Sequence, residues 1–490
     1  MKKVITLAFG ATALIIASCK KDKLDSADKE LIISGTSAPD TLANEITVNT
    51  TLNKTTYLDG IVYVKPGVTL TINPGVTIIG STGPVIPDTT NPRNNKGTLC
   101  IEKGGKLVAN GLASSPIVWT SQQPAGSRKY GDWGGLVVYG LSTIHRANGA
   151  NNGLFEAFDY KPDERNRYGG SDSLDNSGSI TYNRVEFAGG VVYQVNKEVN
   201  GVTLCGVGAG TTFHHNEVSW AGDDGIEFFG GTVNIHHILV YQPHDDCYDF
   251  DEGYHGKHQF TIAYQTANCD NSGSHIIETD NDASATNVGP HTNAFIANAT
   301  FIGPTDTASR PAFDAALGRF YYDGALQIRR HSRLTLVNSL IAAQAEPFLF
   351  VGTPTTAGVT AGSTTDMLFA AVPSLSDSIV ISYNVIQVNN QASAAVRASA
   401  EGNPVTLGLP NDASMVARLG SAANALQLVN TYNDFKLDGV LKPLPGSPAL
   451  TGGQNLAALG LPFFVGTTQR GAIRTTDVWT NEAWISIANN

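Results

Sequence analysis

The feature that most constrains the fold is a motif that recurs after 22 residues. The stretch DDGIEFF begins at Asp223 and DDCYDFD begins at Asp245, and each pairs two aspartates with a following acid and phenylalanine. Their flanks repeat at the same offset, because FHHN (213–216) precedes the first and IHHI (235–238) precedes the second. A sandwich of antiparallel strands has no reason to repeat at a fixed period, whereas a β-solenoid must. The repeat therefore predicts coils stacked at about 4.8 Å.

Short apolar runs bounded by turn residues support a solenoid built of strands. From residue 60 the chain reads GIVYVKPGVTLTINPGVTIIG, in which runs rich in Val, Ile and Thr are separated by Pro-Gly. A third coil follows loosely, since VYQ (240–242) recurs as AYQ (263–265) and YDFD (248–251) is echoed by IETD (277–280). The 51 glycines and the low charged fraction, 15%, argue against a helical bundle. We expect an all-β chain folded as a parallel β-helix.

Residues one coil apart should become neighbours, and the offset specifies which ones. The window 201–256 contains no Lys or Arg but nine Asp and Glu and six of the chain's eleven His. Two acidic motifs in consecutive coils therefore predict a row of carboxylates on one side of the solenoid. The expected vertical pairs are Phe213 with Ile235, His215 with His237, Glu227 with Asp249, and Phe228 with Phe250.

The N-terminal segment has the pattern of a secretory signal. Residues 1–18 contain two lysines followed by an apolar run too short to span a bilayer comfortably. IASC (16–19) resembles the lipobox of bacterial lipoproteins, which predicts a diacylglycerol anchor at Cys19 and an outer-membrane location. The alternative is an ordinary signal peptide with an accidental cysteine. Residues 19–45 are interpreted as the lipidated tether.

Charge and cysteine usage limit the partners. Removing the signal peptide lowers the formal net charge from −11 to −13, so nucleic acid is not an expected partner. The membrane, reached through the lipid anchor, is expected as one partner, and polysaccharide or other envelope proteins as the others. Apart from Cys19, the chain has four cysteines, which permit two disulfides or four buried free thiols, and both alternatives stay open. They are Cys100, Cys205, Cys247 and Cys269.

Several stretches resemble one known family. The chain is similar to the right-handed parallel β-helix lipoproteins of the bacterial envelope, which are relatives in fold of the pectin lyases. This resemblance implies a right-handed β-helix and envelope anchoring, and it carries no substrate or reaction. The matching stretches are GDWGGLVVYG (131–140), YGGSDSLDNSGSITYNRVEFAGG (168–190), DDGIEFFGGTVNIHH (223–237), DDCYDFDEGYHGKHQF (245–260) and FF…RGAI…W (463–479).

Regions that depart from the repeat predict insertions and a cap. The β-helix is expected over residues 46–350, with a long polar loop at 145–178 projecting as a candidate ligand surface. Residues 351–445 are interpreted as an insertion or cap with a short helix at 412–428, because an uncovered last coil would expose a bare parallel edge. Residues 446–490 are expected to complete that cover, with Trp479 and Trp484 as apolar plugs.

The acidic row is a candidate calcium site. Carboxylates a few ångströms apart repel one another unless a cation lies between them or some are protonated. Calcium accepts six to eight oxygen ligands in a loose geometry, although strand alternation prevents all of the candidates from facing one ion. The alternative is a solvated row of turns in which Asp side chains accept from backbone amides. The candidate ligands are Asp223, Asp224, Asp245, Asp246, Asp249 and Asp251.

The histidines of the same coils form a second candidate site. His214, His215, His236 and His237 should stack as two rows, and neutral imidazoles with a carboxylate would suit zinc. The alternative is a ladder whose rings only pack on one another.

An enzymatic reading rests on HDDC (244–247). This stretch resembles the paired-aspartate motif of polygalacturonases, in which one carboxyl protonates the leaving oxygen and another activates water. Asp245 and Asp246 are therefore the catalytic candidates, although the following YHG (254–256) lies closer to the pair than in that family. A lyase would need a Lys or Arg base beside the calcium ligands, and the acidic coils contain none.

Two hypotheses of different classes follow. One is a lipid-anchored binding or surface-structural protein with a calcium-stiffened acidic face that engages glycans or another envelope component. The alternative is a carbohydrate-active enzyme, pectate-lyase-like or polygalacturonase-like. Carboxylates tied to backbone amides favour the first hypothesis, and an open carboxylate pair beside a basic residue favours the second. The aromatic residues expected to form a ligand surface are Trp220, Tyr241, Tyr248 and Tyr254.

Overall fold

The computed structural model covers the β-helix and the C-terminal segment. It describes residues 31–33, 39–83, 95–146, 150–158, 163–194, 197–266, 268–269, 273–284, 286, 288–304, 313–314, 319–320, 322–342, 348–352, 354–355, 358–359, 379–388, 396–400 and 425–487. None of the helices in these ranges has the length and apolar character needed to cross a membrane.

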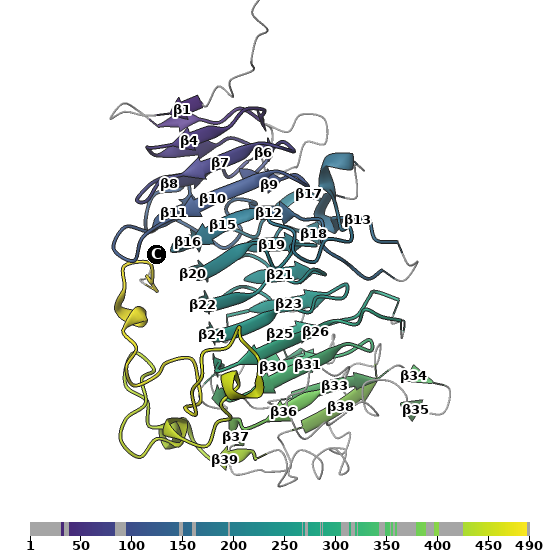
Figure 1. The fold of residues 1–490 in the computed structure, drawn as a ribbon, viewed down its shortest axis with the longest axis vertical. Coiled ribbons are helices and arrows are strands. Elements are labelled where there is room, and N and C mark those ends of the chain that lie inside the picture. The colour runs from purple at the N-terminus through teal and green to yellow at the C-terminus, as the bar shows by residue number, and fades with distance from the viewer. Residues whose placement is uncertain are drawn as a thin grey trace, which may run out of the picture.

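The strands form a right-handed parallel β-helix in which each coil contributes to three ladders (Figure 1). The first ladder contains β1 (Leu31–Ile33), β4 (Thr50–Leu52), β7 (Thr69–Ile72), β10 (Lys106–Asn110), β15 (Gly178–Thr181), β20 (Thr212–Ser219), β22 (Ile235–Tyr241), β24 (Lys257–Tyr264), β26 (Asn293–Ala297), β31 (Arg333–Val337) and β36 (Val380–Ser382). The second contains β2 (Asp40–Thr41), β5 (Thr56–Leu58), β8 (Thr77–Gly80), β11 (Ile117–Ser121), β16 (Asn183–Glu186), the second halves of β20, β22 and β24, then β27 (Thr300–Ile302), β32 (Leu340–Ala342), β37 (Val385–Gln387) and β39 (Gln427–Val429).

The third ladder is a separate sheet, and its outer face carries the acidic residues. It contains β3 (Glu45–Ile46), β6 (Ile61–Val64), β9 (Thr98–Ile101), β12 (Gly135–Tyr139), β19 (Val202–Cys205), β21 (Ile226–Phe229), β23 (Tyr248–Asp251), β25 (Ser274–Thr279), β30 (Tyr322–Ile328), β33 (Phe348–Gly352) and β38 (Val396–Ala400). Short antiparallel hairpins branch from the coils: β13 (Gly153–Leu154) with β14 (Arg167–Tyr168), β17 (Val191–Gln194) with β18 (Lys197–Glu198), β28 (Phe313–Asp314) with β29 (Arg319–Phe320), and β34 (Pro354–Thr355) with β35 (Gly358–Val359).

The register of the ladders confirms the 22-residue repeat. In the described coils, Phe213 pairs with Ile235 and Glu227 pairs with Asp249. The third coil follows as expected, because Asp249 pairs in turn with Glu278 across β23 and β25. The all-β fold predicted from the repeat is therefore confirmed.

The apolar side chains of the three ladders fill the interior of the coils. Leu204, Phe228 and Phe250 form one such column, and each is almost completely buried. Burying a side chain of this size stabilises the fold by about 1.5–3 kcal/mol. The alternate positions of β21 and β23 consequently point outward, which places Glu227 and Asp249 on the outer face.

The corner between the first and second ladders is built from residues with left-handed backbone. Tyr182, His215, His237 and Phe260 occupy this corner in successive coils, with φ between 53° and 57°. The bend allows β20, β22 and β24 to pass from one ladder to the next without ending. It also places the ring of each corner residue above the ring of the next.

The boundaries expected from sequence need adjustment at both ends. Strands β1 and β2 already pair with β4 and β5, so pairing begins within the segment 19–45 that was interpreted as a tether. Strands β36, β37 and β39 continue the ladders past residue 350. The short helix expected at 412–428 lies mostly outside the described residues, and its last residues, from Gln427, belong to β39.

The loop 145–178 does not project from the stack as expected. Its described part includes two 3-10 helices, η2 (Glu156–Phe158) and η3 (Glu164–Asn166), and it folds back onto the third ladder. Phe155 and Phe158 are fully buried there in one apolar cluster with Tyr139 and Phe229. Burial of these aromatic rings holds the loop against the sheet.

The C-terminal segment runs back along the side of the β-helix (Figure 1). It contains η7 (Tyr432–Phe435), η8 (Pro448–Leu450), η9 (Ala457–Leu459) and η10 (Trp479–Asn481). Phe435 packs near the last described coils, whereas Trp479 and Trp484 pack against Leu239 and Ile262 of β22 and β24. The two tryptophans are buried as expected, but they cover the side of the stack and not its end.

Candidate functional site

A column of polar side chains lies on the outer face of the third ladder. Its members occupy equivalent positions of β19, β21, β23, β25 and β30, so that each lies directly beside the next. The three middle positions are acidic and the two outer ones are neutral. In chain order the column is Thr203, Glu227, Asp249, Glu278 and Gln327.

The centre of this column forms a compact carboxylate cluster with the preceding turn. One oxygen each of Asp224, Glu227 and Asp249 lie within 4.8 Å of one another. Glu227 accepts a hydrogen bond from Asn200 Nδ2. Asp249 Oδ1 is buried and has no hydrogen-bond partner among the described residues. Burial, and then the neighbouring carboxylates, raise the pKa of all three acids well above their ordinary values.

The turn before each acidic strand supplies a second cluster. Carboxylate oxygens of Asp223, Asp224 and Asp245 lie within 4.8 Å of one another. Asp224 belongs to both clusters, and its Oδ1 also accepts from the backbone N–H of Asp246 at 2.9 Å. The six predicted aspartates therefore do not form one set, as strand alternation led us to expect, and Asp224 links the turn to the column.

Asp246 is held in a third arrangement, with His275 and Glu278. The three side chains offer ligand atoms within 4.8 Å of one another, and His275 is fully buried. The backbone N–H of His275 donates to Asp246 Oδ1, and His275 Nδ1 lies 3.3 Å from the same oxygen. Asp246 is thus tied to a backbone amide, which favours a structural role for it.

Asp251 lies in the neighbouring column, away from the predicted ion. Its Oδ1 accepts from the backbone N–H of Glu252 at 2.6 Å. Glu252 turns toward the folded-back loop, where Arg146 forms an ion pair at 2.6 Å and the Tyr168 hydroxyl donates at 2.7 Å. This network attaches the loop to the coil that carries Asp249.

Two arginines border the acidic column from the following coil. Arg329 Nε donates to Asp280 Oδ1 at 2.7 Å, and the Arg329 guanidinium also donates to Glu278. Arg330 Nη1 lies 2.9 Å from Asp280. Burial opposes the charge of Arg329, but Glu278 and Asp280 outweigh it and raise its pKa well above the ordinary value. The guanidinium therefore stays protonated.

The aromatic residues proposed as a ligand surface separate into two groups. Tyr248 and Tyr254 are inside the coil, with 1% and 0% of their surface exposed, so that prediction is wrong for these two. Both point inward because they occupy apolar core positions, and each hydroxyl donates to a backbone carbonyl. Trp220 and Tyr241 are partly exposed, and their ring centroids lie 5.4 Å apart.

The exposed aromatic group is larger than the sequence indicated. Tyr130 lies 5.7 Å from Trp220 and 5.0 Å from His244, and Tyr264 stacks on Tyr241 at 5.2 Å. These partly exposed rings form what we call the aromatic cluster: Tyr130, Trp220, Tyr241, His244 and Tyr264. The cluster adjoins the carboxylate turn, since His244 directly precedes Asp245 in the chain.

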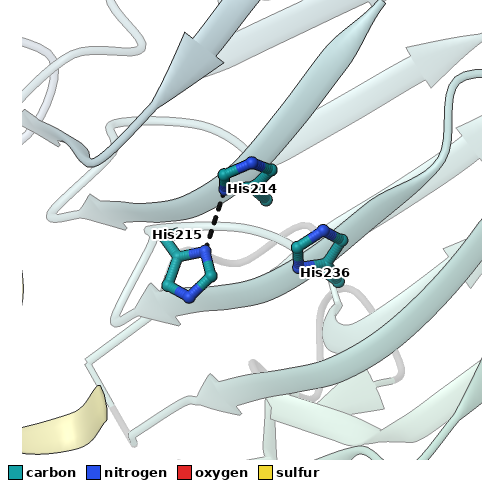
Figure 2. Close-up of side chains that lie close together, drawn as sticks. All are labelled: His214, His215 and His236. Atoms are coloured by element: carbon teal, nitrogen blue, oxygen red, sulfur yellow. Dashed lines mark hydrogen bonds between the residues drawn. The ribbon is translucent and has the colours of Figure 1, made fainter. Parts of the chain in front are cut away.

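The four histidines form the two predicted rows on the first ladder, and Figure 2 shows three of them, His214, His215 and His236. His214 stacks on His236 with ring centroids 4.6 Å apart, and His215 stacks on His237 at 4.4 Å. Within each coil the two rings also meet, because His214 Nδ1 and His215 Nδ1 lie 2.9 Å apart. Burial lowers the pKa of His215 to about 3 and that of His236 to about 4, so these rings are neutral at pH 7.

Sequence reasoning missed several residues of the acidic face. Glu227 was paired with Asp249 but was not counted as a ligand, although the offset of 22 already placed it in the column. Glu278 was aligned with Asp249 through the match of YDFD with IETD but was likewise not counted as a ligand, and His275 lies outside both motifs. Tyr130 comes from a distant turn and has no signal in the repeat.

The four cysteines are present as thiols in the structure. Cys100, Cys205, Cys247 and Cys269 are all buried and form no disulfide with one another. Burial raises the pKa of the Cys100 and Cys205 thiols, which keeps them protonated. Of the two alternatives that the sequence left open, the structure therefore contains buried thiols and not two disulfides.

The fold and its outer face define the class of the protein as a right-handed parallel β-helix with a concentrated acidic column. The sequence matches the pectate-lyase like beta helix domain family over residues 43–408, and the chain belongs to this family. Comparison with curated proteins and with solved structures gave no match. The expected fold family is therefore confirmed. Cys19 lies outside the described residues, and anchoring through it stays a prediction.

Proposed function

We propose that the protein is a lipid-anchored envelope protein that binds calcium on its acidic column and engages glycans or another envelope component beside it. The observation that carries this proposal is the cluster of Asp224, Glu227 and Asp249. Three carboxylates from two coils converge there, and one buried oxygen of Asp249 lacks a hydrogen-bond partner among the described residues. A cation bound between the three carboxylates would give that oxygen a partner and would neutralise the repulsion among them.

The donors fit calcium better than other common cations. They are carboxylate oxygens, which hard cations prefer, and calcium tolerates irregular geometry and additional water ligands. Magnesium demands near-ideal octahedral geometry at shorter distances, which side chains fixed by β-helix register meet poorly. The turn cluster of Asp223, Asp224 and Asp245 offers further oxygens on the same side, through the shared Asp224.

The aromatic cluster supports a role in glycan recognition. Partly exposed Tyr and Trp rings supply a flat apolar surface, with hydroxyl and indole groups able to hydrogen-bond at their edges. Trp220 directly follows β20 and Tyr241 ends β22, and the turns after them carry Asp223 and Asp245. A sugar stacked on these rings would therefore lie near the carboxylate turn, where calcium bridges an acidic sugar to the protein.

An enzyme is the alternative, and Arg329 beside the acidic column is the observation in its favour. A lyase mechanism needs a base in its deprotonated form, which can accept the proton taken from the substrate. Arg329 is instead held in its charged form by Glu278 and Asp280. Asp246, one of the two catalytic candidates, is buried and accepts from a backbone N–H. These contacts support the binding role over catalysis.

The first experiment is a calcium titration followed by thermal melting. A specific ion at 100 times its dissociation constant adds about 2.7 kcal/mol to the folded state. We expect a larger shift with calcium than with magnesium, and an equal shift would remove the calcium assignment. Incubation with polygalacturonate and other acidic glycans then separates the roles. Retention of intact polymer supports binding, whereas shortened chains would establish the enzyme.

Membrane anchoring has its own test. Growth with a labelled fatty acid should label the protein through Cys19, and Cys19→Ser should abolish the label and release the protein from the membrane fraction. Labelling that survives this substitution would overturn the anchor.

A further inference from the structure

The histidine stack, formed by His214, His215, His236 and His237, occupies only two coils of a longer aromatic column. The corner column runs Tyr182, His215, His237 and Phe260, so aromatic packing at the corner is satisfied by Tyr and Phe as well as by His. Packing alone therefore does not require histidine at the two middle coils.

The column beside the corner also contains histidine at these two coils only, among the four coils compared. His214 and His236 are flanked in the ladder by Thr181 on one side and Gln259 on the other. Imidazoles thus occur in pairs, one at the corner and one beside it, in two adjacent coils and in neither coil that flanks them. A pair of imidazoles gives a chelating unit that a single ring in a packed ladder would not.

The rings face each other through their nitrogens. The Nδ1 atoms are 2.9 Å apart in the pair His214–His215, and the same distance separates the pair His236–His237. At a metal–nitrogen distance of about 2.05 Å, this separation subtends about 90° at an ion placed between them, which is the angle of tetragonal Cu(II) or Ni(II). A tetrahedral zinc ion would spread the two nitrogens to about 3.3 Å.

A third ring nitrogen lies near this pair. His214, His215 and His236 each offer a ring nitrogen within 4.8 Å of the others, and all three side chains are partly exposed (Figure 2). An ion can therefore reach the rings from solvent. Figure 2 shows His236 below His214 on the next strand, with His215 to one side.

We propose that the histidine stack is a second metal site, separate from the acidic column, that binds a tetragonal transition-metal ion, Cu(II) foremost, through His214, His215 and His236. The ion takes the place of the hydrogen between the two Nδ1 atoms of one pair, and the ring that carried it takes up a proton at Nε2 by exchange with solvent, so that both rings bind as neutral imidazoles. The site uses none of the residues assigned to calcium, so either proposal can fail without the other.

The test is a Cu(II) titration of the purified full-length protein carrying no histidine tag, read by competition with a chromogenic chelator. We expect one tight equivalent. His214→Gln should weaken it by at least about 10–100-fold, the loss that removing even an indirect partner of a ligand causes. His255→Gln is the matched control, because His255 is a partly buried histidine outside the stack whose Nδ1 contacts the Gly253 carbonyl. Binding in this control should not change.

Electron paramagnetic resonance of the unmodified protein gives a readout that does not depend on any variant folding. Couplings from at least two imidazole nitrogens support the site. A spectrum with oxygen ligands only, or Cu(II) binding that His214→Gln leaves unchanged, would overturn it. Asp249→Asn should retain the copper signal, which separates this site from the acidic column.

Discussion

Replacing Asp249 by Asn tests the acidic column directly, because it removes one charge and keeps the shape of the side chain. Two unit charges 4.8 Å apart repel by about 3.5 kcal/mol at an effective dielectric constant of about 20. Proton uptake already relieves part of this, since the pKa of Asp249 is raised by burial and by Glu278. We therefore expect Asp249→Asn to increase calcium-free stability by about 2 kcal/mol.

The same substitution should remove the response to calcium. The wild type should gain about 2.7 kcal/mol at saturating calcium, which corresponds to about 3 °C in the melting temperature for a cooperative unit of about 400 residues. Asp249→Asn should melt higher than wild type in chelator and show little further shift with calcium. Differential scanning calorimetry with chelator, calcium and magnesium measures all of these quantities.

Glu217→Gln is the matched control for that experiment. Glu217 is a fully buried carboxyl, and burial raises its pKa to about 7, but it lies on β20, where it accepts from Ser219 and from the backbone of Ser486. Its calcium shift should equal that of wild type. If Asp249→Asn is less stable than wild type in chelator, or if both variants respond equally to calcium, the convergence of carboxylates on one ion is refuted.

Three further measurements test other parts of the structure. Trp220→Ala should weaken retention of an acidic glycan in affinity electrophoresis by at least about 10-fold, as the loss of an aromatic anchor does, and unchanged mobility would exclude the aromatic cluster. The carboxyls of Glu252 and Glu278 have pKa values raised from 4.5 to about 7, so their contribution to calcium-free stability is complete below pH 4.5 and is lost as the pH rises through 7. In urea unfolding, calcium should therefore raise the free energy of unfolding more at pH 8, where these carboxyls are ionised, than at pH 5. Arg329→Gln should destabilise the fold by about 3–5 kcal/mol, because it leaves Glu278 without its guanidinium partner and Asp280 with Arg330 alone, and a neutral effect would show that solvent already screens them.

The period of the sequence was sufficient to predict the neighbours along the stack, but not the side of the sheet on which each residue lies. Glu227 meets Asp249 because coils of equal length must superpose their equivalent positions. Tyr248 and Tyr254 were misplaced because a tyrosine fits the interior as well as the surface once its hydroxyl reaches a carbonyl. That choice depends on the volume left by neighbouring coils, which the repeat does not encode.

Contacts from outside the repeat were harder to predict. The loop after residue 145 turns back because Phe155 and Phe158 find an apolar surface on the third ladder, around Tyr139 and Phe229. That surface exists only after the coils have stacked. Similarly, the C-terminal tryptophans pack on Leu239 and Ile262, more than 200 residues earlier in the chain, and no local pattern joins the two segments.

The acidic column itself is the strongest argument that the face has a function. Its two ends show that neutral polar residues suit this position, because Thr203 and Gln327 occupy it in the coils before and after the acidic ones. Neutral side chains at Glu227, Asp249 and Glu278 would avoid both the desolvation and the mutual repulsion of three carboxylates. Glu278 is offset by Arg329, but the fold gains nothing from the charges of Glu227 and Asp249 in the absence of a cationic partner. A cation that binds there converts the same repulsion into affinity, which is why charge concentrated in the middle coils is expected of a binding face and not of a scaffold alone.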